Sequence, residues 1–162
     1  MKTRIKMNVL IHSVTLAVVL FTGIVVQAES GEKIKPINEA ALNKLISAND
    51  TFLVLSFMAA WCGPCIDELP VLNRLHKKYK NQNFKIIGIS IDFGGPGAMA
   101  PILKKMNIKF PVYWCGEKGI RKFNLNAIPM LLFIRRGASV ERIHGKRTEK
   151  FLDQKIQEFL RL

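Results

Sequence analysis

Residues 51–80 contain two cysteines, separated by two other residues, at the point where a strand pattern changes to a helix pattern. The run "TFLVLSFMA" is almost entirely apolar and of strand length, which indicates a strand buried on both faces of a helix-covered sheet. Beyond Cys62 and Cys65, apolar residues recur at helical spacing and predict an amphipathic helix. Its apolar side consists of Ile66, Leu69, Leu72, Leu75 and Tyr79. We therefore expect the cysteine pair where a buried strand ends and a helix begins.

The rest of the chain continues this alternation of helices and strands. Helical patterns occupy residues 37–50, 98–108 and 148–160, a second buried strand occupies 84–91, and 130–136 with 139–145 form a predicted hairpin. Asn38 and Thr148 are the predicted N-caps of the first and last helices. The residues of the last helix that we expect to face inward are Phe151, Leu152, Ile156, Phe159 and Leu160. Early alternation and a late hairpin predict an α/β domain, a mixed sheet between two helical layers, over residues 29–162.

The first 28 residues have a different composition. Three basic residues precede the apolar run "VTLAVVLFTGIVV", and "QAES" follows with Val26 and Ala28 at positions −3 and −1 of a cleavage site. As a helix this run would rise about 20 Å, which is less than the roughly 30 Å of a bilayer core. We therefore expect a signal peptide over residues 1–28 that is cleaved after Ala28, with an uncleaved membrane anchor as the alternative. Either outcome places the domain in the periplasm or at the outer face of the bacterial cytoplasmic membrane.

Residues 29–162 carry 22 Lys and Arg against 12 Asp and Glu, a net charge of +10. The basic runs, such as "HKKYK" at 76–80, contain no interleaved aromatic platform, and an exported protein does not meet nucleic acid. We expect no nucleic-acid partner and a basic surface that favours anionic membranes or acidic partners.

The cysteine spacing suits thiol chemistry at a helix terminus. There, unpaired amide groups and the helix dipole stabilise a thiolate and lower its pKa from about 8.5 toward about 7 or below. Cys62 is therefore the expected exposed nucleophile, and Cys65, one turn later, the more buried second thiol. Pro64 suits the first helical turn, where its missing N–H costs no hydrogen bond. The pair predicts attack on a substrate disulfide by Cys62 and resolution of the mixed disulfide by Cys65.

Two other uses of the cysteines are less consistent with the sequence. A structural zinc site would need Cys115 and either His76 or His144 besides the pair, and there is no second Cys-x-x-Cys. A cysteine-dependent peroxidase would have threonine where Ala59 lies, three residues before the first cysteine. We expect no metal and no cofactor. Cys115 is expected to be a buried, weakly reactive residue.

The motif "AAWCGPC", with "AIPM" at 127–130, resembles the thioredoxin superfamily over nearly all of residues 33–162. The segment 86–114 and Cys65-x-x-Glu68-x-Pro70 are similar to the exported TlpA/ResA type, although the N-terminal part is closer to an ordinary thioredoxin lead-in helix. The resemblance implies a thioredoxin-like three-layer sandwich. It also implies that Pro129 is a cis proline beside the cysteines.

The resemblance also implies where substrate binds. The backbone of Ile128, before Pro129, would pair with an extended substrate segment next to Cys62, a short form of strand addition. The substrate surface would be completed by Trp61, Gly63 and Pro64.

Glu68 has two interpretations. It is either a carboxylate on the helix surface or, three residues after Cys65 and on the same helical face, the group that accepts the Cys65 proton. Ordinary thioredoxins have a buried aspartate six residues before the first cysteine, where this chain has Ser56. A serine cannot act as a base near neutral pH, which favours Glu68 for proton transfer.

The sequence therefore predicts an exported, monomeric protein-disulfide oxidoreductase. The Gly-Pro dipeptide matches thioredoxin, whose potential is about −270 mV, rather than the oxidising DsbA type at about −120 mV. The resemblance implies electrons from a membrane thiol carrier of the DsbD/CcdA type, and disulfide-containing exported proteins such as apocytochrome c as substrates. The alternatives are a disulfide oxidase or isomerase, and a non-catalytic module that binds metal or protein.

Overall fold

The computed structural model describes residues 34–47, 51–136 and 138–161. The predicted signal peptide or anchor, residues 1–28, lies outside these ranges. Within them, no helix combines the length and the apolar character needed to cross a membrane. The elements are β1 (Lys35–Pro36), α2 (Glu39–Ser47), β2 (Phe52–Met58), α3 (Gly63–Lys78), β3 (Phe84–Ser90), α4 (Ala100–Lys105), β4 (Val112–Trp114), α5 (Glu117–Phe123), β5 (Met130–Arg135), β6 (Ala138–His144) and α6 (Glu149–Arg161).

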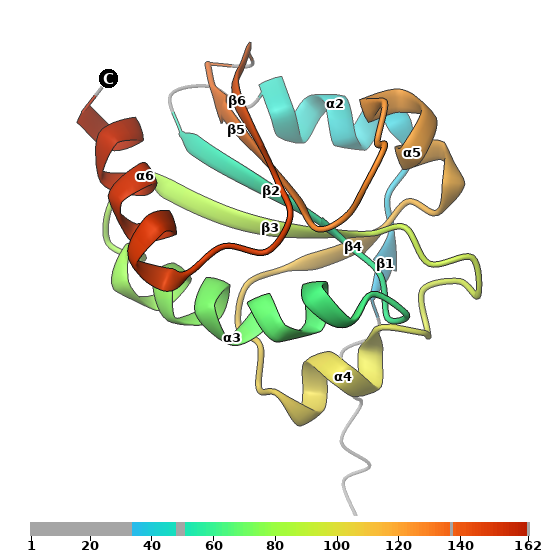
Figure 1. Ribbon diagram of the computed structural model, residues 1–162. Helices are drawn as coiled ribbons and strands as arrows, with labels where there is room; N and C mark the ends of the chain where they lie inside the picture. The colour runs from blue at the N-terminus through green and yellow to red at the C-terminus, as the bar shows by residue number, and fades with distance from the viewer. Residues whose placement is uncertain (1–33, 48–50, 137, 162) are drawn as a thin grey trace, which may run out of the picture. The chain divides into compact units, whose positions relative to one another are not determined.

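The strands form one mixed sheet in the order β1-β4-β3-β2-β5-β6. Strand β2 lies between β3, to which it is parallel, and β5, to which it is antiparallel. Figure 1 shows α3 and α6 on one face of the sheet and α2 and α5 on the other. The predicted α/β sandwich is thereby confirmed, including the antiparallel β5–β6 hairpin.

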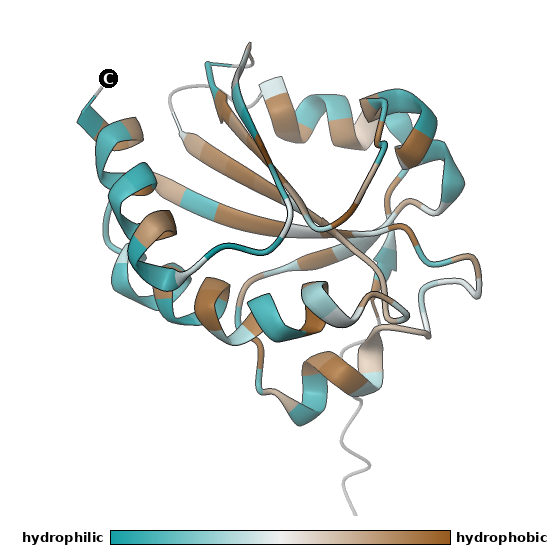
Figure 2. Ribbon diagram, viewed as in Figure 1, coloured by the Kyte–Doolittle hydropathy of each residue, from teal (hydrophilic) through white to brown (hydrophobic). Residues whose placement is uncertain are grey.

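The core lies on both faces of β2, as its apolar run predicts. Residues 53–58 are all buried, and Figure 2 shows the central strands as predominantly hydrophobic beneath helices with hydrophilic outer surfaces. The apolar side of α3 packs onto this sheet through Leu69, Leu72 and Leu75, each at most 2% exposed. Burial of such side chains contributes about 1.5–3 kcal/mol each.

The N-caps of both terminal helices are as predicted. The Asn38 side chain accepts a hydrogen bond from the Ala41 N–H at 2.8 Å, and the Thr148 hydroxyl accepts one from the Phe151 N–H at 3.3 Å. The prediction that Phe151 faces inward was wrong, because this residue is 37% exposed. The buried stripe of α6 runs through Leu152, Ile156 and Phe159. Phe151 lies one position off this stripe, with the Arg147 guanidinium 5.5 Å from its ring.

Two elements were not predicted: β1 and α5. Strand β1 contains two residues, too few for a periodic pattern. Helix α5 has seven residues and buries only Gly119 and Phe123. Its ends are set by the backbone, with Gly116 at φ 56° before it and Asn124 in the left-handed region after it. Glycine and asparagine adopt these positive φ values most readily.

Candidate active site around the cysteine pair

Cys62 and Cys65 form a disulfide at the junction of β2 and α3, with Cα atoms 5.3 Å apart. Cys62 is the N-cap of α3, and its Sγ accepts a hydrogen bond from the Cys65 N–H at 3.3 Å. Its carbonyl oxygen accepts the N–H groups of Cys65 and Ile66 at 3.0 and 3.1 Å. Pro64 occupies the first turn of the helix. The reactive sulfur thus lies at the positive end of a helix dipole and within reach of a backbone donor.

Cys62 is less accessible than the sequence suggested, whereas Cys65 is buried as expected. Cys62 is 6% exposed and Cys65 is 2% exposed. The expected order of exposure is right, but an exposed Cys62 is wrong for this disulfide form. Its sulfur is turned toward the helix, where it is bonded to Cys65 and accepts the Cys65 amide.

The surface beside the cysteines is formed by Trp61, Gly63 and Pro64, which are all exposed. The Trp61 side chain is 59% exposed and lies parallel to the ring of Phe93, with a centroid distance of 6.2 Å and an interplanar angle of 3°. Phe93 is itself 63% exposed and follows the end of β3. The protein therefore presents two stacked aromatic rings next to the sulfurs.

Pro129 precedes β5, and the Ile128–Pro129 peptide bond is cis. Met130, the next residue, pairs with Phe57 near the C-terminal end of β2. Pro129 therefore lies at the end of the strands from which the chain continues to the cysteines. The Pro129 carbonyl accepts the Gly145 N–H at 2.8 Å. Within the described residues, the backbone N–H and C=O of Ile128 have no hydrogen-bond partner. These groups remain available to an extended segment.

Glu68 is buried, so its interpretation as a surface carboxylate is wrong. The residue is 1% exposed, and its Oε1 accepts the Arg147 N–H at 2.9 Å. Its Oε2 is buried with no hydrogen-bond partner among the described residues. Burial raises the pKa of this carboxyl, while the Arg147 hydrogen bond partly opposes the rise. A carboxyl with a raised pKa can exchange a proton closer to neutral pH than an exposed one.

Asp92 is a residue of the site that the sequence analysis missed. It is 1% exposed; its Oδ1 accepts the Ala60 N–H at 2.8 Å and its Oδ2 accepts the Ser90 hydroxyl at 2.8 Å. Its backbone carbonyl accepts the Trp114 indole N–H at 2.7 Å. Asp92 thus fixes the loop that leads to Trp61 and Cys62. A carboxylate directly after the apolar "IIGISI" was the available signal, because a charge there is buried only when it has partners.

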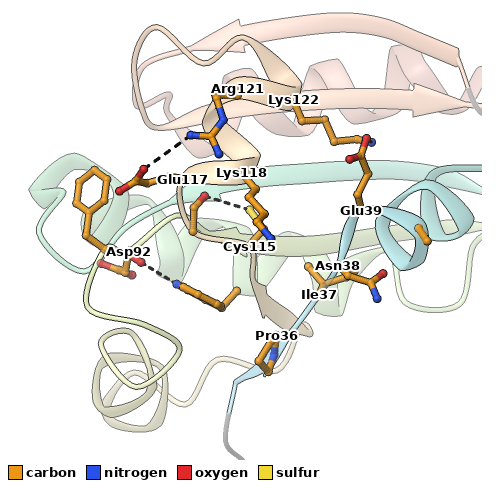
Figure 3. A pocket seen from close by; sticks show the side chains of 14 residues that line it. Pro36, Ile37, Asn38, Glu39, Asp92, Cys115, Glu117, Lys118, Arg121 and Lys122 are labelled. Carbon is orange, nitrogen blue, oxygen red and sulfur yellow. Dashed lines mark hydrogen bonds and ion pairs between the residues drawn. The ribbon is translucent and has the colours of Figure 1, made fainter.

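Cys115 is buried as expected, at 8% exposure, and burial raises the pKa of its thiol to about 11. It lies in the wall of a pocket of about 1410 Å³ whose other walls come from α2, α5 and the loop after β3 (Figure 3). Within the described part of the chain, no group of three or more His, Cys, Asp or Glu side chains could hold a metal ion. Ser56 is 1% exposed and supplies no ionisable group.

Comparison with known proteins gives a consistent result. The family model for the AhpC/TSA family matches residues 29–141. A thiol-disulfide oxidoreductase ResA of Bacillus cereus is 33% identical over 105 residues, which are 64% of this chain and 60% of that protein. The match therefore spans about three fifths of the curated relative's own length.

Solved structures agree in fold. A candidate thiol:disulfide interchange protein DsbE from Chlorobium tepidum superposes with a TM-score of 0.66 at 26% identity, covering 72% of this chain and 84% of that one. StoA from Bacillus subtilis superposes with a TM-score of 0.59 at 17% identity, covering 65% and 82%. At 17% identity, the similarity to StoA supports the fold alone.

Proposed function

Because the chain belongs to the AhpC/TSA family, we propose that it is a thiol–disulfide oxidoreductase that reduces disulfides in extracytoplasmic proteins. The observation that carries the proposal is the Cys62–Cys65 disulfide at the start of α3, with Cys62 as the cap of the helix. The similarity to ResA supports the same chemistry.

The catalytic cycle begins with the reduced protein. The Cys62 thiolate attacks a substrate disulfide, forms a Cys62–substrate disulfide and releases the other substrate sulfur, which takes a proton from water. Cys65 then loses its proton, attacks the Cys62 sulfur and expels the second substrate sulfur as a thiolate, which takes a proton from water. Two electrons pass from the dithiol to the substrate, and the protein returns to the disulfide form of the structure.

In this cycle Glu68 accepts the proton that Cys65 loses. Its buried carboxyl has a raised pKa and an unpartnered Oε2, and it follows Cys65 by one helical turn. In the Glu68→Gln variant, the rate at which Cys65 resolves the mixed disulfide should no longer show the titration of a carboxyl group in its pH profile. The rate of attack by Cys62 should keep the pH profile of the wild type. If both profiles match those of the wild type, Glu68 is not the proton acceptor.

The substrates in this proposal are exported proteins with disulfides, among them apocytochrome c, and the electron donor is a membrane thiol carrier of the DsbD/CcdA type. Substrate binds along Trp61, Gly63 and Pro64, with its backbone against Ile128 beside Pro129. The N-terminal leader directs the domain out of the cytoplasm. The unpartnered backbone of Ile128 and the exposed rings beside Cys62 support this arrangement.

Trapping tests the proposal and names the partners. A Cys65→Ala variant in the native host should accumulate mixed disulfides through Cys62, which mass spectrometry would identify, and a Cys62→Ala/Cys65→Ala double variant is the control. The measured potential should lie nearer to about −270 mV than to about −120 mV; a value near the latter would make the protein an oxidase. If the protein is a binding module without catalytic activity, it should not accelerate the reduction of insulin by dithiothreitol.

A further inference from the structure

One of the two stacked rings, that of Phe93, also lines the pocket beside α2 and α5. Among the described residues only three large hydrophobic side chains are exposed: Trp61, Phe93 and Phe151. Trp61 directly precedes Cys62, and Phe93 both stacks on Trp61 and lines the pocket. Phe93 therefore connects the ring beside Cys62 in the chain with a hollow of about 1410 Å³. Large exposed apolar groups that adjoin a cavity commonly mark a contact surface.

The charged side chains that line this pocket are not all paired with one another. Lys122 pairs with Glu39 at 2.9 Å, and Arg121 lies 3.8 Å from Glu117. Lys118, which is exposed and lines the pocket from α5, has no acidic partner in the described ranges (Figure 3). The remaining lining carboxylate, Asp92, already accepts hydrogen bonds at both oxygens from its own loop and strand. The lining thus carries three basic and three acidic side chains, and Lys118 is the basic group among its described residues that has no ion pair.

We propose that this pocket, together with the Trp61–Phe93 rings, is a docking groove for an extended segment of the substrate protein that carries an apolar residue near its disulfide and acidic residues farther along. The inference rests on the proposed function and specifies its substrate class. The apolar residue packs on the rings while the substrate disulfide lies at Cys62, and the acidic residues approach Lys118. An arm of about six extended residues spans about 20 Å.

The geometry of the walls explains why a polypeptide fits better than a small ligand. Phe93 belongs both to the pocket lining and to the pair of stacked rings, so an occupant of the pocket can also contact the ring that packs on Trp61. Its walls come from β1 and the start of α2, the loop after β3, the end of β4 and the helix α5, and none of them belongs to α3. Contacts there strengthen binding without altering the sulfurs, and they act only on substrates long enough to reach them.

The test uses the reduced protein in single turnovers with three disulfide substrates. Two are disulfide-cyclised peptides, identical except for an arm of about six residues that is acidic in one and lysine-rich in the other. The third is hydroxyethyl disulfide, which is too small to reach the pocket and serves to normalise each variant's rate. The wild type should reduce the acidic peptide several-fold faster than the lysine-rich one.

Two variants report on the two parts of the groove. Phe93→Ala should lower the normalised rate for both peptides about three- to tenfold, the range expected for loss of an aromatic contact. Lys118→Glu should remove the preference for the acidic peptide, a change of about two- to fivefold for a surface charge pair. Phe151→Ala and Lys150→Glu, both on α6, are matched controls that should behave as the wild type. Phe93→Leu keeps an apolar side chain and should be intermediate.

The outcomes separate the two levels of the proposal. If Phe93→Ala and Lys118→Glu match their controls on the peptides, the groove is not a docking site, although reduction itself continues. A preference for the lysine-rich peptide overturns the assignment of an acidic partner. If the wild type reduces none of the three disulfides, the proposed function is wrong, and the groove is then not a docking site for a disulfide substrate.

Discussion

At the scale of single residues, Glu68 is a carboxyl group held in a buried environment. Its carboxyl is buried beneath the Arg147 amide and keeps one oxygen without a partner in the described structure. Burial favours the protonated form and therefore raises its pKa above 4.5. The folded protein then binds this proton more tightly than the unfolded chain does. The stability that the protonated carboxyl contributes is complete below pH 4.5 and is lost as the pH rises through the raised pKa.

Replacing Glu68 by glutamine should remove this loss. The variant cannot ionise at this position, so its stability relative to that of the wild type should increase as the pH rises from below 4.5 to neutrality. Urea unfolding at several pH values measures the difference. Glu158→Gln, at an exposed position on α6, is the surface control. A difference that does not vary with pH would mean that the Glu68 carboxyl ionises as in the unfolded chain.

Cys115 should be almost inert in the folded protein. Its thiol has a pKa of about 11 instead of 9.0, so about one hundredth of the usual thiolate is present at mildly alkaline pH. In the oxidised protein the other two sulfurs are bonded, and iodoacetamide can label only this one. We expect labelling in the native state to be at least about 100-fold slower than after urea unfolding, as followed by mass spectrometry. Equal rates would contradict a buried Cys115.

At the scale of elements, the long strands and helices could be predicted from periodicity, but the pieces that complete the site could not. Strand β2 and helix α3 carry seven- and sixteen-residue patterns that leave little ambiguity, and they place the cysteines. Helix α5 has a glycine at one of its two buried positions, so no hydrophobic stripe marks it. The pocket and the role of Asp92 depend on contacts between segments distant in sequence, which no local pattern contains.

The glycine inside α5 is required by its contact with the residue that follows β4. A Cβ at Gly119 would collide with the Cys115 sulfur. Gly119→Ala should therefore destabilise the protein by about 1–3 kcal/mol, although alanine otherwise favours a helix. In the double variant with Cys115→Ala the sulfur is absent, and most of this loss should be recovered. Urea midpoints measure the cycle, and Gly94→Ala, where nothing lies within 4 Å, is the control. Strict additivity would exclude the contact.

Asp92 joins the end of β3 to the loop before α3. Asp92→Ala leaves the Ala60 N–H and the Ser90 hydroxyl without their acceptor and should cost about 1–3 kcal/mol. Asp92→Asn keeps an oxygen for Ala60 and should recover much of the loss. Hydrogen exchange of the Ala60 amide tests the link directly, since its protection should fall in the alanine variant. Unchanged protection would show that the loop is held by other contacts.

At the scale of the whole molecule, the two redox states should differ in stability in the direction that the function requires. A reductant donates electrons because its disulfide form is the more stable folded state, whereas a strong oxidant such as DsbA has a stabilised dithiol form. We expect urea unfolding to give a higher midpoint for the oxidised protein, by on the order of 1–3 kcal/mol. The Cys62→Ala/Cys65→Ala variant should show no dependence on added reductant. A more stable dithiol form would assign the protein to the oxidases.

The pocket has walls from α2 and α5, while both reactive sulfurs belong to the start of α3. The contribution of the pocket to target choice is consequently encoded apart from electron affinity, so a mutation in α5 can alter the first and leave the second intact. An engineer could exchange the α5 segment to redirect the protein toward new clients without retuning its driving force.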